Sequence, residues 1–194
     1  MYPRPRTIAT PAAYAVAALS VAYAIVYLGF VRPSGGDNVV AVLLTDGFIA
    51  ASGLFVTIVA VSLGERVAGS EGRWVALVGV GWALLSATHG AFAFSADLEG
   101  VSVPQLSSTD PRGFATFGLA GIWTIALGLL VRQGRGGLPR PLGTLAVVAG
   151  ADLVLLYLAT ALAPDTLVGV VAGGLASVVL GPAFWVWTGS ALRR

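Results

Sequence analysis

Long apolar runs alternate with short polar segments along the chain and divide it into six parts of similar length. The runs cover residues at about 11–31, 39–63, 74–94, 111–131, 141–163 and 167–190. An α-helix needs about 20 apolar residues to cross the ~30 Å hydrocarbon core of a bilayer. A backbone inside lipid must also satisfy its own hydrogen bonds, as a helix does. The pattern therefore predicts an all-α six-transmembrane helix bundle, with residues 1–194 forming a single polytopic membrane domain.

Local signals predict where some of these helices begin, end or bend. Thr10 followed by Pro11 is typical of a helix start, with a capping hydroxyl and proline at the first helical position. Residues 65–73 are polar and predict a loop between the second and third spans. Gly181-Pro182 predicts a kink in the last span.

The arginines predict the orientation of the bundle. With six spans, nine of them fall on the side of the two termini: Arg4, Arg6, Arg66, Arg73, Arg132, Arg135, Arg140, Arg193 and Arg194. Only Arg32 and Arg112 fall on the other side. Loops rich in Lys and Arg stay in the cytoplasm. We therefore expect both termini to be cytoplasmic, in a multi-pass protein of the cell membrane.

Composition supports lipid as the solvent and excludes several kinds of chemistry. Only 10% of the residues are charged and 57% are hydrophobic, whereas a soluble domain carries about 25% charged residues. The chain has no cysteine and no lysine, which excludes thiolate metal sites and Schiff-base cofactors. Its single histidine excludes a multi-histidine metal cluster, and the scattered arginines form no nucleic-acid patch. We expect no bound metal and no cofactor.

Three ionisable residues lie inside the predicted spans: Asp46, His89 and Asp152. A charged group in a membrane helix is costly, so such residues face the bundle interior or a wet cavity. Our hypothesis is that the three line one outward-opening cavity, as a proton relay or as a site for a small polar or cationic ligand. The alternative is that each is a buried hydrogen-bonding group that holds helices together.

Small residues recur at every fourth position of the last span, at Gly169, Gly173, Ser177 and Gly181. Such stripes let helix backbones approach closely. They predict a helix-packing face, either within the bundle or between two copies in a homodimer.

Three sequence elements in the second half carry a resemblance. They are Gly113-Phe-Ala-Thr-Phe-Gly-Leu-Ala-Gly-Ile-Trp123, Leu138-Pro-Arg-Pro-Leu-Gly143 and Gly181-Pro-Ala-Phe-Trp-Val-Trp-Thr-Gly189. Over residues 110–194 the chain resembles an uncharacterised integral membrane family, domain of unknown function 4386. The resemblance implies a bacterial or archaeal multi-span protein and implies no activity.

For function, the sequence favours a multi-pass membrane protein that transports or senses a small molecule, or is proton-linked, through an outward-facing polar cavity. The alternative is a structural or accessory subunit of a larger membrane complex. A membrane enzyme acting on lipid or quinone-like substrates is disfavoured, because we find no nucleophile or metal motif.

Overall fold

The computed structural model describes residues 5–101, 114–163 and 166–193, and within these ranges the regular structure is helical. The first part of the chain forms α1 (Pro5–Val26), η1 (Tyr27–Val31), α2 (Val39–Val67) and α3 (Gly69–Leu98). The second part forms η2 (Phe114–Leu119), α5 (Ala120–Arg132), η3 (Arg135–Gly137), α6 (Arg140–Leu162), α7 (Leu167–Gly174), η4 (Leu175–Leu180) and α8 (Gly181–Leu192). Here η1, η2 and η4 are π-helical turns that continue into or from an α-helix, and η3 is a single 3₁₀ turn.

Five of the resulting helical spans are long and apolar enough to cross a membrane: Ile8–Val31, Val39–Val67, Gly69–Leu98, Arg140–Leu162 and Leu167–Leu192. Thr116–Arg132 is a shorter apolar helix at the place of the predicted fourth span, whose first residues lie outside the described ranges. The all-α helix bundle is confirmed for the described residues, and five of the six predicted spans are long and apolar enough to cross a membrane.

The helix ends differ from the sequence expectation at two places. The first helix begins at Pro5, so Pro11 lies inside it rather than at its start; membrane helices accommodate proline more often than soluble ones. The expected loop at 65–73 is instead one tight turn, in which Ala68 has φ 60° and Gly69 has φ 66°. The 29 residues of α2 rise about 44 Å at 1.5 Å each. Polar residues near this turn therefore extend beyond a ~30 Å hydrocarbon core while staying helical.

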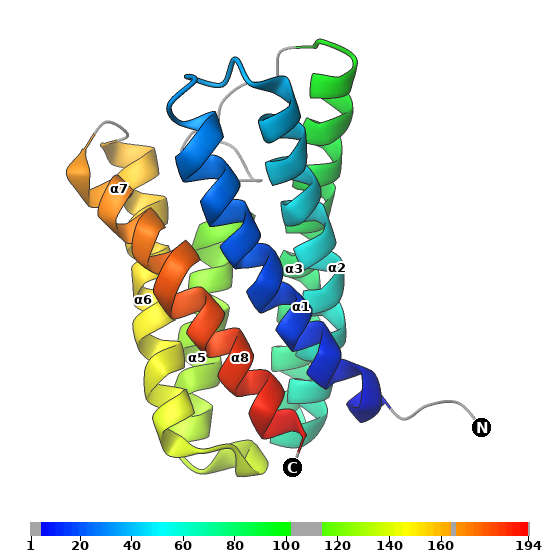
Figure 1. Cartoon of the computed structure of the whole chain (residues 1–194). Coiled ribbons are helices and arrows are strands. Elements are labelled where there is room, and N and C mark those ends of the chain that lie inside the picture. Colours follow the sequence, from blue (N-terminus) through cyan, green and yellow to red (C-terminus); the bar gives the residue numbers. More distant parts are fainter. Residues whose placement is uncertain (1–4, 102–113, 164–165, 194) are drawn as a thin grey trace.

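The start of α1 and the end of α8 lie at the same end of the bundle, which we call the terminal end (Figure 1). Figure 1 shows α1 beginning and α8 ending there, together with the α2–α3 turn and the connection between α5 and α6. Arg66 Nη2 donates to the Leu192 carbonyl at 3.0 Å, which joins the end of α2 to the end of α8. Arg135 and Glu71 form an ion pair there at 3.3 Å.

Glycines bring the helices of two hairpins into backbone contact. In the α2–α3 hairpin, a Cβ on Gly53 would lie 2.5 Å from the Ala83 carbonyl oxygen, and one on Gly90 would lie 2.6 Å from that of Asp46. In the α5–α6 hairpin, Gly121 and Gly150 face each other, and a Cβ on either would meet the other's carbonyl oxygen at 2.7 or 2.6 Å. Such close approach maximises van der Waals contact where lipid supplies no hydrophobic driving force.

Trp123 joins the two hairpins. Its side chain on α5 is fully buried, and its Nε1 donates to the Val75 carbonyl of α3 at 2.8 Å. Gly79 leaves the space for this indole, because a Cβ there would lie 2.7 Å from Trp123 Nε1. The ring also lies 5.8 Å from that of Trp82, centroid to centroid.

The outer surface of the bundle is apolar. Leu77, Leu162 and Leu167 are 74%, 77% and 74% exposed, and many other Val, Leu and Phe side chains are exposed with them. So large an apolar exterior is unfavourable in water. It fits a bilayer as the environment of this protein.

Candidate functional site

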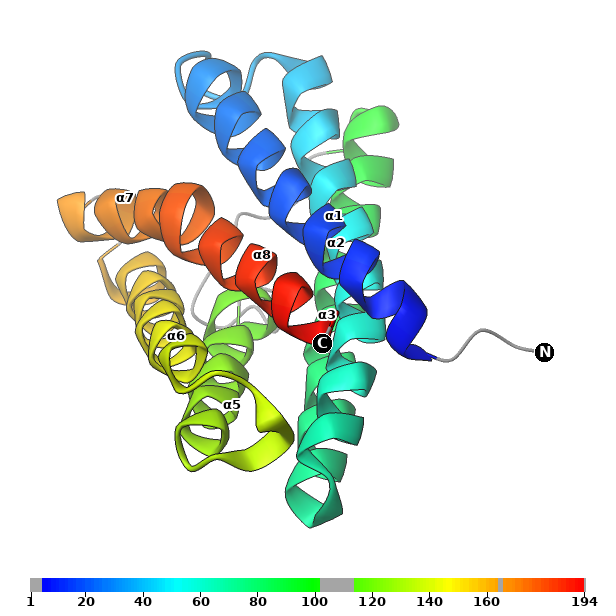
Figure 2. The same ribbon diagram turned by 60° about the horizontal axis from the view of Figure 1, so that its bottom comes forward.

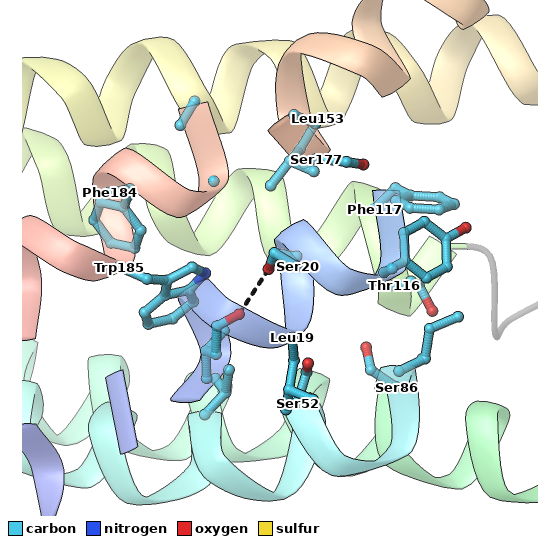
Figure 3. A pocket seen from close by; sticks show the side chains of 18 of the residues that line it. Leu19, Ser20, Ser52, Ser86, Thr116, Phe117, Leu153, Ser177, Phe184 and Trp185 are labelled. Atoms are coloured by element: carbon cyan, nitrogen blue, oxygen red, sulfur yellow. Dashed lines mark hydrogen bonds between the residues drawn. The ribbon is translucent and has the colours of Figure 1, made fainter. Parts of the chain in front are cut away.

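A cavity of about 190 Å³ lies at the centre of the bundle. Its lining residues come from α1, α2, α3, η2 with α5, α6, and η4 with α8, so all six helical spans contribute. Phe48, Phe117, Phe184 and Trp185 supply aromatic walls from three of these spans. Figure 3 shows the lining side chains converging from opposite sides of the bundle.

Some polar side chains of the cavity are satisfied within their own helices. Ser20 donates to the Val16 carbonyl at 2.9 Å, and Thr124 donates to the Ala120 carbonyl at 2.7 Å. This bond to the preceding turn is the usual solution for a hydroxyl in a membrane helix.

Other polar groups of the cavity have no hydrogen-bond partner within the described part of the chain. They include the Ser86 hydroxyl and the Trp82 indole Nε1, which are buried, and also the hydroxyls of Ser52 and Ser177 and the indole Nε1 of Trp185. Figure 3 shows the Trp185 nitrogen facing the cavity, with the Ser52 and Ser86 oxygens on the opposite wall. Buried polar groups are almost always hydrogen bonded. The buried Ser86 hydroxyl and Trp82 Nε1 therefore mark the cavity as a place for a molecule that bonds to them.

Two of the π-helical turns form part of this wall. Thr116 and Phe117 belong to η2, and Ala176, Ser177 and Leu180 belong to η4. In η4 the Gly181 N–H bonds to the Ala176 carbonyl five residues before it. Pro182 follows directly and has no backbone N–H to donate, so it cannot form the usual α-helical hydrogen bond. The wider π-turn therefore lies immediately before this proline. π-Turns occur frequently at functional sites.

The structure brings Asp46 and His89 into one hairpin. His89 on α3 is 8% exposed, and the next residue, Gly90, contacts the backbone of Asp46 on α2. The carboxyl of Asp46 lies near enough to that of Asp97, near the end of α3, for the two to interact electrostatically. Asp46 Oδ2 is buried and has no donor among the described residues. Two carboxyl groups form a hydrogen bond only when one of them holds a proton.

Asp152 lies in the other hairpin. It is on α6, which packs on α5, α7 and α8, whereas α2 and α3 pack on each other. Its Oδ2 is buried and has no partner among the described residues. Oδ2 of each aspartate is buried, although both residues are partly exposed as a whole. None of Asp46, His89 and Asp152 is among the residues that line the central cavity. That they share one cavity stays a prediction.

Within the described ranges, no group of three or more His, Asp or Glu residues is placed to hold a metal ion.

The small residues of the last span make looser contacts than those of the two hairpins. A Cβ on Gly169 would lie 3.7 Å from Ala159 Cβ, and one on Gly173 would lie 3.5 Å from Leu156 Cδ1, both ordinary distances. Ser177 lines the cavity and Gly181 closes the π-turn. The glycines face α6 of the same chain, and whether the stripe also forms a dimer face stays untested.

The uncharged polar residues of the cavity were not predicted as a site. The sequence does contain a weak indication of them, since Ser52, Ser86 and Ser177 each interrupt an apolar span. A lone serine or tryptophan is common in membrane helices, so only the three-dimensional arrangement distinguishes these from packing residues.

The fold and cavity define a multi-pass helical membrane protein with a central internal site. No model of a known protein family matches the chain, and neither the curated proteins nor the solved structures contain a significant match. The resemblance of residues 110–194 to domain of unknown function 4386 therefore receives no support from these comparisons.

Proposed function

We propose that this membrane protein binds a small molecule in its central cavity and acts as a transporter or a sensor of that molecule. The observation that carries the proposal is the cavity itself, lined by all six helical spans and holding unpaired polar groups. A ligand that touches every span has different contacts in each arrangement of those spans. Such differential contact is what allows a ligand to shift a conformational equilibrium.

We further propose that the terminal end of the bundle faces the cytoplasm. Arg66, Arg73, Arg132, Arg135 and Arg140 lie at or near helix ends on that side, and only Arg32 lies in a described segment at the opposite end. This distribution supports the orientation by the positive-inside rule. The Asp46–Asp97 pair then lies toward the outer side.

The same carboxyl pair is our candidate for proton linkage. A shared proton between Asp46 and Asp97 would be released or taken up when α2 and α3 move at that end. Asp46→Asn keeps a hydrogen-bond donor for Asp97 but has no proton to exchange. We expect this variant to fold normally and to lose any pH dependence of ligand binding, whereas the Asp152→Asn variant keeps it.

Native mass spectrometry of the protein, extracted gently from its own membrane, tests the binding function. Ala149 and Ala151 give a matched pair on α6, because Ala149 is 4% exposed and lines the cavity whereas Ala151 is exposed. We expect a bound small molecule that is lost in Ala149→Leu, which fills the cavity, and retained in Ala151→Leu. Equal retention in the two variants would contradict the proposal. A stoichiometric second polypeptide in place of the ligand would favour an accessory subunit.

A further inference from the structure

The chemistry of the cavity wall restricts what it can bind. The lining residues are apolar, aromatic or hydroxyl-bearing, and none of those in the described chain is charged. A charged ligand would lose its hydration there without an opposite charge to replace it. The ligand is therefore neutral.

Trp185 adds the direction of a hydrogen bond. Its side chain is 8% exposed, its Nε1 faces the cavity, and it makes no hydrogen bond within the described residues. An indole N–H can only donate. Trp123 shows the usual arrangement, since its Nε1 donates to a carbonyl at 2.8 Å. A ligand in the cavity can supply to Trp185 the acceptor that the Val75 carbonyl supplies to Trp123.

The size and walls of the cavity indicate a ring. A cavity of ~150 Å³ with apolar walls holds one benzene, so about 190 Å³ suits one six-membered ring with small substituents. Tyr23, Phe48, Phe117, Phe184 and Trp185 place aromatic groups around it. Aromatic side chains pack well against a planar ring, stacked or edge to face.

We infer that the cavity binds a neutral planar ring bearing a carbonyl oxygen, the chemistry of a quinone ring, with Trp185 Nε1–H donating to that oxygen. The Ser52 hydroxyl, which comes from α2, also lines the cavity and can donate to a second oxygen of the ring. This inference rests on the proposed binding function and names its ligand class.

Two probes of the same shape separate hydrogen bonding from packing. Duroquinone carries two carbonyl oxygens on a tetramethyl ring, and durene is the tetramethylbenzene without them. Equilibrium dialysis of the full chain in lipid nanodiscs, against empty nanodiscs, gives the affinity of each probe. We expect duroquinone to bind at least fivefold more tightly than durene, since a net hydrogen bond contributes about 1 kcal/mol.

Two tryptophan variants on α8 complete the test. Trp185→Phe keeps an aromatic wall but removes the donor, and we expect about a fivefold loss of duroquinone affinity with durene binding unchanged. Trp187→Phe is the matched control, because Trp187 is 39% exposed and does not line the cavity. It should leave both affinities unchanged.

Other outcomes overturn the inference without deciding the proposed function. If durene binds as tightly as duroquinone, or if Trp185→Phe weakens both equally, Trp185 is only a wall and the carbonyl assignment is wrong. If neither probe binds above the level of empty nanodiscs, the ring assignment is wrong. The proposed function is judged separately, by the ligand retained in the Ala149 and Ala151 variants.

Discussion

The two hairpins and the pair formed by the first and last spans are held together in different ways. The α2–α3 and α5–α6 hairpins touch backbone to backbone along their glycines, and Trp123 joins one to the other. The first and last spans meet near the terminal end, where α1 packs on α8 and Tyr14 hydrogen bonds to Ser190 at 3.0 Å. Away from that end, α1 and α7 diverge, as Figure 2 shows.

This difference suggests a division of roles around the cavity. Backbone contact leaves little freedom for one helix to slide on another, so the joined hairpins form a fixed wall. The last span packs less closely: α7 lies chiefly on α6 and η4, whereas α1 packs on α2 as well as on α8. The cavity lies between the joined hairpins and these two spans.

The largest effect should come from separating the helices of one hairpin. Gly121→Ala puts a Cβ 2.7 Å from the Gly150 carbonyl oxygen, so α5 and α6 must move apart, at a cost of about 2 kcal/mol. Gly173→Ala is the matched control in the last span, where the new Cβ has ordinary contacts. Thermal unfolding in detergent measures both. Equal melting temperatures would show that the hairpins are no more tightly packed than the last span.

Next in size is the link between the hairpins. Trp123→Phe removes the hydrogen bond to the Val75 carbonyl and leaves a small void beside Gly79. We expect a loss of about 2 kcal/mol in the free energy of unfolding. Trp187→Phe, on the exposed face of α8, should change it little. An unchanged stability of the Trp123 variant would mean that the hairpins are held together by something else.

A smaller effect is expected where α1 meets α8. Tyr14→Phe keeps the ring but loses the hydroxyl bonded to Ser190, which contributes about 1 kcal/mol. The ring can still pack below Arg193, whose guanidinium carbon lies 5.6 Å from its centroid. If the first and last spans move together as a pair, hydrogen exchange should increase in α1 and α8 and stay constant in the hairpins. Uniformly faster exchange throughout would contradict the division.

The smallest effect should be at the surface. The Arg135–Glu71 ion pair joins the ends of the two hairpins, but its side chains are 53% and 39% exposed. An exposed pair contributes about 0–1 kcal/mol and is screened by salt. Glu71→Gln should therefore lower the melting temperature only slightly at low salt, and not at all at high salt. A large effect at high salt would show that this contact is part of the fixed wall.

The helical membrane fold followed from the sequence because lipid imposes a length and a composition on each span. The tight turn at Ala68 could not be predicted in the same way. The charged residues around it indicated a loop, because the sequence does not show how far the helices extend beyond the hydrocarbon core. Similarly, the small residues of the last span were conspicuous in sequence, yet the closest contacts are made by Gly121 with Gly150 and by Gly53 with α3. Small residues allow close approach, and the partner helix decides whether it occurs.

The candidate site was less predictable than the fold. Asp46, His89 and Asp152 were predicted as the site because ionisable groups are costly in lipid. The central cavity is lined instead by neutral groups such as Ser52 and Trp185. A polar side chain can bond within its own helix, as Ser20 does, or remain available in the cavity. The outcome depends on its rotamer and on the neighbouring helices, and the spacing of residues in the sequence predicts neither.

The π-turn at η4 has a consequence for the phase of the last span. Successive residues of an α-helix are rotated by about 100° around its axis, and a π-turn inserts one residue without adding a turn. The faces of α7 and α8 are therefore offset, and a stripe spaced by four residues does not stay on one side across Ser177 and Gly181. If the extra residue moved along the chain, α7 would rotate about its axis while α8 kept its place on α1. The rotation would turn Ser177 relative to the cavity and leave the terminal end unchanged.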